Sequence, residues 1–187
     1  DVSTLTEKPA GRSPVVTHVV DDSLAPWVRR TWERVAEECR KGGAAYVVCP
    51  RIGDGEPFEP GEDLPDDLID LDFATPEQTR GVLRTADDLA DGPLAGLRIG
   101  VMHGRLHSSE KADVMRRFAA DSGTPDAIDV LVATSVIEVG VDVPSATMMV
   151  VLDAESFGVS QLHQLRGRVG RAHLPGHGGR HRVPVTP

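Results

Sequence analysis

Three arginines in the last quarter of the chain have a spacing that could do chemistry. Arg166, Arg168 and Arg171 lie within six residues and are separated by Gly167 and Gly170. Glycine lets a backbone approach a ligand closely, and a guanidinium is a permanently charged, planar set of donors that matches phosphate oxygens. An arginine that reaches a transferring γ-phosphoryl group can raise the rate by about 10³–10⁵. A solvated basic turn would have the same composition, so these arginines alone leave both interpretations open.

A polar segment lies upstream of the arginines, directly after an apolar run. Val130–Ala133 is short and rich in β-branched residues, which is typical of a buried strand. Open α/β sheets bind ligands at the carboxyl ends of their strands, and the polar residues come where that end is expected. They are Thr134, Ser135, Glu138, Gly140 and Asp142.

Two stretches of this region together resemble a known family. TSVIEVGVDVP (residues 134–144) and QLHQLRGRVGR (residues 161–171) are similar to motifs V and VI of the second helicase superfamily. Their wording looks most like that of the RecG-type branch-migrating DNA helicases. The resemblance extends from GRSPVVTHVV, which starts at Gly11, to Arg171. It implies an enzyme that uses ATP to remodel branched DNA, such as replication forks and Holliday junctions, in recombination and repair.

In helicases of this kind two RecA-like domains clasp ATP between them, and the resemblance makes this chain the second domain. It implies that Arg168 and Arg171 reach the γ-phosphate of ATP bound on the partner domain. Gln164 would order that interface, and Gly140 and Asp142 would lie near the nucleotide ribose and the path that couples ATP to DNA.

The resemblance also implies a DNA-binding set of residues. Thr134 and Ser135 match positions that contact the DNA backbone, and the turn at His103 and Gly104 does likewise. Such contacts position a strand without reading its sequence. The implied partners are branched DNA and the N-terminal motor and wedge domains of the same protein.

Some residues that a complete motor needs are missing from this sequence. No G-x-x-x-x-G-K-[ST] occurs, and no Asp-Glu pair follows a predicted strand, so the phosphate-cradling loop and its metal ligand are absent. ATP and Mg²⁺ would therefore be held mainly by the N-terminal motor domain. We expect the isolated chain to bind ATP weakly and to hydrolyse it negligibly.

The hydrophobic pattern predicts an α/β fold, a parallel sheet with helices on both faces, and this agrees with the RecA-like domain that the resemblance implies. Residues 1–14 are expected to connect from the preceding motor domain, 15–171 to form the helicase C-terminal domain, and 172–187 to be a truncated or atypical tail without a strand. Ile52–Ala74, rich in Gly, Pro and acidic residues, is predicted to be a loop.

The predicted strands are Val15–Val20, Ala44–Cys49, Leu97–Met102, Val130–Ala133 and Met148–Leu152. The predicted helices are Ala25–Lys41, one from Thr75 to about Asp91, and Ser108–Ala120 with Ser108 as its cap.

The amino-acid composition limits which partners and which cellular location we expect for the protein. The net charge of −9 comes from residues 51–100, where thirteen acids face four arginines, so total charge gives no support to a nucleic-acid surface. Cys39 and Cys49 lie in apolar contexts, which favours buried free thiols in a reducing cytosol.

No signal peptide or apolar run long enough for a membrane span is present, and we expect a cytoplasmic protein with no membrane partner. His173, His177 and His181 are spaced by four, but the glycines and proline between them argue against a helix, so we predict no metal site.

Three other interpretations stay open at this point. The domain could belong to a DNA translocase such as a transcription-repair coupling factor, which shares QLHQLRGRVGR. It could be a nucleic-acid-binding module that kept the fold and lost the motor. An unrelated α/β ligand-binding domain would need both long motifs to arise by chance.

Overall fold

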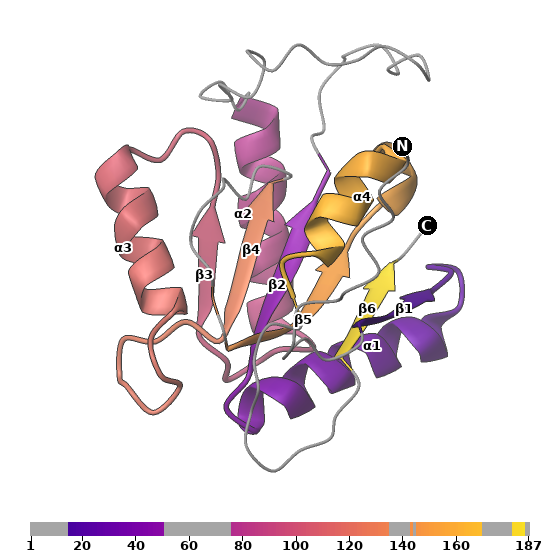
Figure 1. The fold of residues 1–187 in the computed structure, drawn as a ribbon, viewed down its shortest axis with the longest axis horizontal. Coiled ribbons are helices and arrows are strands. Elements are labelled where there is room, and N and C mark those ends of the chain that lie inside the picture. The colour runs from indigo at the N-terminus through magenta and orange to yellow at the C-terminus, as the bar shows by residue number, and fades with distance from the viewer. Residues whose placement is uncertain (1–14, 51–75, 135–142, 144, 170–180, 186–187) are drawn as a thin grey trace, which may run out of the picture.

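The computed structural model describes residues 15–50, 76–134, 143, 145–169 and 181–185. Six strands form one parallel sheet in the order β1-β6-β5-β2-β4-β3 (Figure 1). The strands are β1 (Val15–Val19), β2 (Ala44–Cys49), β3 (Ile99–Met102), β4 (Val130–Thr134), β5 (Ala146–Val151) and β6 (His181–Val185). The helices are α1 (Ala25–Arg40), α2 (Pro76–Asp91), α3 (Ser108–Phe118) and α4 (Val159–Arg166).

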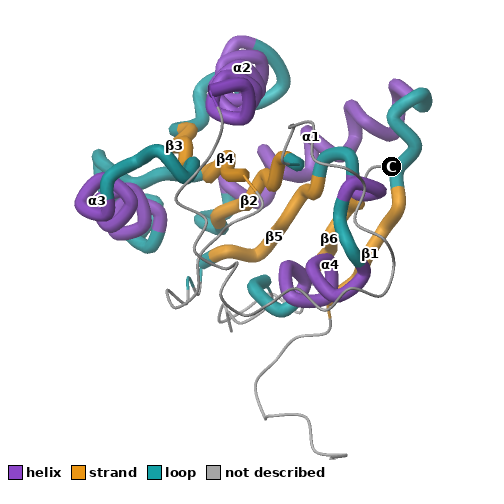
Figure 2. Tube along the Cα trace, turned by 90° about the horizontal axis from the view of Figure 1, so that it is seen from above, coloured by secondary structure: helices purple, strands orange, loops and turns teal. Residues whose placement is uncertain are grey.

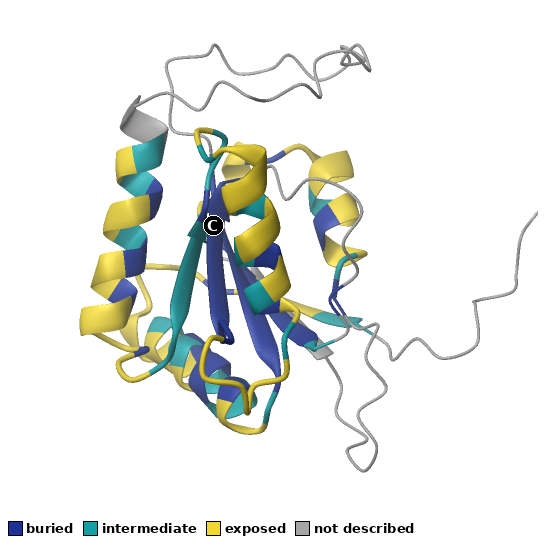
Figure 3. Cartoon of the chain, turned by 90° about the vertical axis from the view of Figure 1, so that its left-hand side faces the viewer, coloured by how far each residue is buried: buried dark blue, intermediate teal, exposed yellow. Residues whose placement is uncertain are grey.

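The centre of the sheet is β2, whose residues are all buried, as expected of a continuous apolar run covered on both faces. Val47 is in register with Val132 of β4 on one side and with Val150 of β5 on the other. Figure 3 shows the sheet interior as buried and the outer faces of the helices as exposed. The buried sheet fixes the positions of the strand ends.

Each face of the sheet has its own hydrophobic cluster. Residues of α1 and α2, among them Val35 and Val82, pack on one face, and residues of α3 and α4, among them Phe118 and Leu165, pack on the other. Figure 2 shows α1 and α4 on opposite sides of β5, β6 and β1. The predicted parallel sheet with helices on both faces is therefore confirmed.

Several predicted boundaries agree with the structure. The predicted bounds of β2 match, and α1 ends just before Gly42, whose φ of +90° is a conformation that favours glycine. Cys39 and Cys49 are buried free thiols, also as predicted, and burial raises the pKa of Cys49 to about 11. The predicted loop Ile52–Ala74 lies outside the described residues.

The tail is where the sequence-based expectation was wrong. We expected residues 172–187 to be a truncated or atypical tail without a strand. The structure nevertheless places β6, which contains Pro184, between β1 and β5. The segment fills a gap between two parallel strands that would each otherwise present an unpaired edge.

Two local expectations also need correction. His107, and not Ser108, is the N-cap of α3, because the Glu110 carboxylate accepts a hydrogen bond of 2.8 Å from the backbone N–H of His107. The third strand begins at Ile99 rather than at Leu97, since the Leu97 amide donates to the Leu94 carbonyl in the turn after α2. No helix within the described ranges is long and apolar enough to cross a membrane.

Candidate functional site

The carboxyl ends of the strands share one edge of the sheet, because all six strands run in the same direction (Figure 1). His103 and Gly104 follow β3, Thr134 ends β4, and Asp153 comes two residues after β5. β4 and β5 lie on either side of β2 although they follow each other along the chain. Such a crossing is where open α/β sheets characteristically bind ligands.

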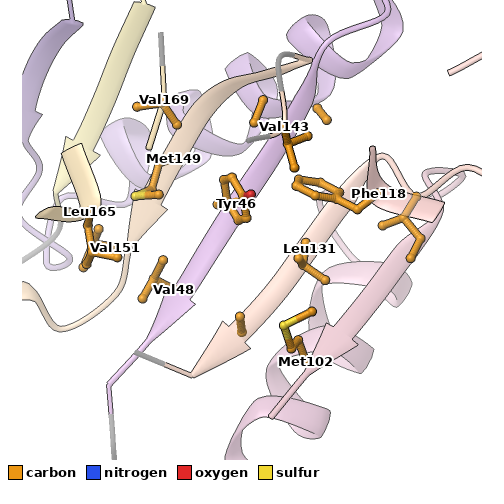
Figure 4. Packing of buried hydrophobic residues seen from close by; sticks show 14 of the residues in the cluster. Tyr46, Val48, Met102, Phe118, Leu131, Val143, Met149, Val151, Leu165 and Val169 are labelled. Carbon is orange, nitrogen blue, oxygen red and sulfur yellow. The ribbon is translucent and has the colours of Figure 1, made fainter. Parts of the chain in front are cut away.

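Helix α4 carries Gln164 and leads directly to Arg168. The helix starts at Gly158, whose N–H donates to the Gln161 side chain at 3.1 Å, and it ends at Gly167. Leu165 and Val169 are buried and point toward Val151 and Met149 of β5 (Figure 4). These apolar contacts fix the helix on the sheet by burying one side of it.

The polar residues of this segment remain accessible on the other side. Gln164 is exposed and Arg168 is partly exposed. Within the described parts of the chain no ion pair joins Arg168 to a carboxylate. Arg171, Gly140 and Asp142, the other residues predicted to act on the nucleotide, lie outside the described residues.

The turn between β5 and α4 has an unusual backbone. Asp153 adopts a left-handed conformation with φ 45° and ψ 55°, and its carbonyl accepts a hydrogen bond from Ser156 at 2.9 Å. Ala154 and Phe157 are buried and hold the turn down. Burial raises the pKa of the Asp153 carboxyl, and the negative charges of Glu155 and Asp22 raise it further. Sequence patterns did not single out Asp153, because aspartate in a turn is too common to signal a left-handed backbone.

His103 and Thr134 come from neighbouring strands. β3 and β4 pair in register, with Met102 opposite Ala133, so the two residues that follow are adjacent at the sheet edge. Thr134 is 4% exposed, so its hydroxyl faces the interior and a contact with DNA would rely on the backbone around it. Ser135 lies outside the described residues, and the DNA contacts of this group stay a prediction.

The surroundings of His103 lower the pKa of its imidazole. Burial lowers the pKa of its imidazole, as do the positive charges of Arg105 and Lys111, while Glu110 acts in the opposite direction. Its Nδ1 is buried and has no hydrogen-bond partner within the described part of the chain. Arg105, two residues on, is exposed, and the sequence reasoning missed it because a single arginine in a turn carries no motif. The turn can thus offer an imidazole, backbone amides and one guanidinium to an anionic strand.

The structure divides the predicted site into two regions. His103, Gly104 and Thr134 lie at the ends of β3 and β4, whereas Gln164 and Arg168 lie with α4 over β5. The central strand β2 separates the two regions.

Comparison with known proteins gives consistent matches. Residues 72–173 match the model of the helicase conserved C-terminal domain. The ATP-dependent DNA helicase RecG of Mycobacterium leprae is 45% identical over 177 residues, which cover 94% of this chain and 22% of that protein. The ATP-dependent DNA helicase RecG of Bacillus subtilis is 40% identical over 171 residues, or 91% of this chain and 21% of that protein.

A solved structure of RecG bound to a three-way DNA junction matches the fold with a TM-score of 0.64 and 34% sequence identity. The match covers 97% of this chain and 19% of that one. The chain thus spans about a fifth of the length of the relatives that it resembles.

Proposed function

Because this chain belongs to the family of helicase conserved C-terminal domains, we propose that it is the second motor domain of an ATP-dependent DNA helicase of the RecG type. The observation that carries the proposal is Arg168: a helix packed on β5 presents it, and no described carboxylate neutralises it. The two RecG relatives above are described as ATP-dependent DNA helicases, which supports the same activity.

ATP would be shared between this domain and a preceding motor domain. Arg168 and Arg171 would donate to the γ-phosphate, Gln164 would order the interface, and Gly140 and Asp142 would lie toward the ribose. When bound, ATP with Mg²⁺ supplies the phosphoryl group whose hydrolysis drives the motor. The residues of this chain would stabilise the negative charge of that group across the interface, which is the role that isolated guanidiniums fill best.

DNA would bind at the other region of the sheet edge. We assign His103, Gly104, Thr134 and Ser135 to contacts with the DNA backbone, and branched DNA as the substrate of the whole protein. The RecG match to a structure with a three-way junction supports this substrate class. Closing and opening of the two motor domains with ATP would move these contacts along the strand, by shifting the populations of two states.

The first test is the DNA-stimulated ATPase of the complete protein that contains this domain, with and without Arg168→Ala. We expect turnover to fall by about 10³-fold or more while nucleotide binding is retained, because the arginine acts mainly on the transition state. Stimulation should be stronger with branched than with linear DNA. Unchanged turnover in Arg168→Ala would remove the arginine from the mechanism, and equal stimulation by both DNAs would favour a generic translocase.

A further inference from the structure

Arg166, the first of the three arginines in the segment, has a partner of its own within the fold. Its Nη2 donates a hydrogen bond of 3.2 Å to the main-chain carbonyl of Val15, which lies 151 positions away in the sequence. Val15 is the first residue of β1. The contact joins the last turn of α4 to the start of the edge strand of the sheet.

Apolar packing accompanies this hydrogen bond. Val15 and Leu162 are both partly buried against the hydrophobic cluster that contains Leu165 and Val169. Figure 2 shows α4 beneath β6 and β1, on the side of the sheet opposite α1. The polar contact and the apolar one therefore hold the same two segments together at the same place.

The two described arginines of the segment thus have different surroundings. Arg166 is directed to a backbone carbonyl of β1, while Arg168 has no described carboxylate partner. An exposed guanidinium that already donates to a carbonyl is less available to a phosphate than one that does not. Arg166 and Arg168 therefore have different roles although both are arginines.

We propose that Arg166 is a positioning residue, which ties the helix that carries Gln164 and Arg168 to the start of β1. The inference rests on the proposed function, in which Gln164 and Arg168 act on a nucleotide shared with the preceding motor domain. Arg166 would hold α4 against β1 and so fix the orientation of Arg168 toward that nucleotide. Loss of the contact should impair the catalytic step and leave nucleotide binding unchanged.

The experiment compares five forms of the complete protein: wild type, Arg166→Ala, Arg166→Lys, Arg168→Ala and Arg29→Ala. Arg29 is the matched control, because it is 76% exposed on α1 and its only described ion pair is the one with Glu33 at 3.9 Å. Turnover and KM for ATP are measured with saturating branched DNA, together with the thermal midpoint of each variant.

We expect Arg166→Ala to lower kcat about fivefold, the rate equivalent of one net hydrogen bond, with KM for ATP within about twofold of wild type. Arg166→Lys should recover most of the turnover, because an ammonium can also donate to a carbonyl. Arg29→Ala should behave as wild type, and all thermal midpoints should agree within a few degrees.

Three results would overturn the inference: wild-type turnover in Arg166→Ala, a raised KM for ATP, or no recovery in Arg166→Lys. A raised KM would mean that Arg166 contacts the nucleotide directly. The proposed function fails separately, when wild type shows no DNA-stimulated turnover or when Arg168→Ala turns over like wild type. The two failures are therefore distinguishable in one set of measurements.

Discussion

Arg166 and Arg168 share a side chain, and their local sequence gives no means of assigning them different roles. The difference appears only when the chain is folded, because the partner of Arg166 is the carbonyl of Val15, at the other end of the sequence. The resemblance to motif VI did place Arg168 on the nucleotide. A contact across 151 positions is a property of the tertiary structure, and spacing within a motif does not contain it.

The turn after β3 leads to a prediction about charge. Burial lowers the pKa of the His103 imidazole, so we do not expect it to release a counterion when DNA binds at pH 7.5. We expect His103→Gln in the complete protein to leave the salt dependence of DNA affinity unchanged at this pH. Arg105→Gln should reduce the slope of log K against log salt by about 1, since its exposed guanidinium can neutralise a phosphate.

The measurement is DNA affinity at several salt concentrations, by fluorescence anisotropy. Arg116→Gln serves as the control, because Arg116 lies in the last turn of α3 and is paired with Asp113. A fall in the slope with His103→Gln at pH 7.5 would show that the imidazole is charged when bound, contrary to the prediction. An unchanged slope with Arg105→Gln would remove this turn from the DNA interface.

At the scale of elements, the ion pair between Arg98 and Asp129 links the amino ends of β3 and β4. Arg98 donates from Nη2 to Asp129 at 2.6 Å and from Nε at 2.9 Å, and its backbone N–H binds the same carboxylate. A further hydrogen bond of 2.8 Å runs from Nη2 to the carbonyl of Ser122. Burial acts to raise the pKa of Asp129, but the hydrogen bonds from Arg98 outweigh it and hold that pKa below its ordinary value.

We predict that Arg98→Ala lowers the free energy of unfolding of the 187-residue chain by about 2–3 kcal/mol at pH 7, because it leaves the buried Asp129 carboxylate without its charged partner. Urea titration measures this, and Arg116→Ala, which removes an exposed pair, should change it by less than about 0.5 kcal/mol. The pKa of Asp129 is depressed in the folded state, so the contribution is complete above its unfolded value of 3.8 and is lost as pH falls through the folded value. A cost that persists undiminished in strong acid would contradict this explanation.

The sequence predicted well those strands and helices that form because of their local sequence, independently of their pairing with other elements. β2 is a continuous apolar run and could be delimited to the residue, and α1 has an apolar face and a glycine end. β6 was missed because its stability comes from pairing with β1 and β5 on both sides, whereas its own composition argues against a strand. The cap of α3 was misassigned by one residue, since serine has the stronger general preference but His107 has the better local geometry.

At the scale of the whole molecule, the alternation of strands and helices predicted a parallel sheet but not the order of its strands. That order, with β4 and β5 on opposite sides of β2, is what separates the region of His103 from the region of Arg168. Local periodicity cannot show which strands pair, because pairing depends on which faces the crossing helices cover. The sequence therefore singled out both groups of candidate residues, whose roles stay predictions, but it did not show how the groups are arranged.

The last prediction concerns what this domain does alone. Its sequence has no G-x-x-x-x-G-K-[ST] and thus no loop of this kind to hold the phosphates and metal. In the proposed function, Arg168 acts on a nucleotide that another domain holds. We expect the isolated chain to show no ATPase activity above background, with or without branched DNA. Adding the purified N-terminal part of the complete protein should restore DNA-stimulated turnover, and the same mixture made with the Arg168→Ala chain should not. Turnover by the isolated wild-type chain that survives further purification would mean that it holds its own nucleotide site, and the division of roles between two motor domains would then be wrong.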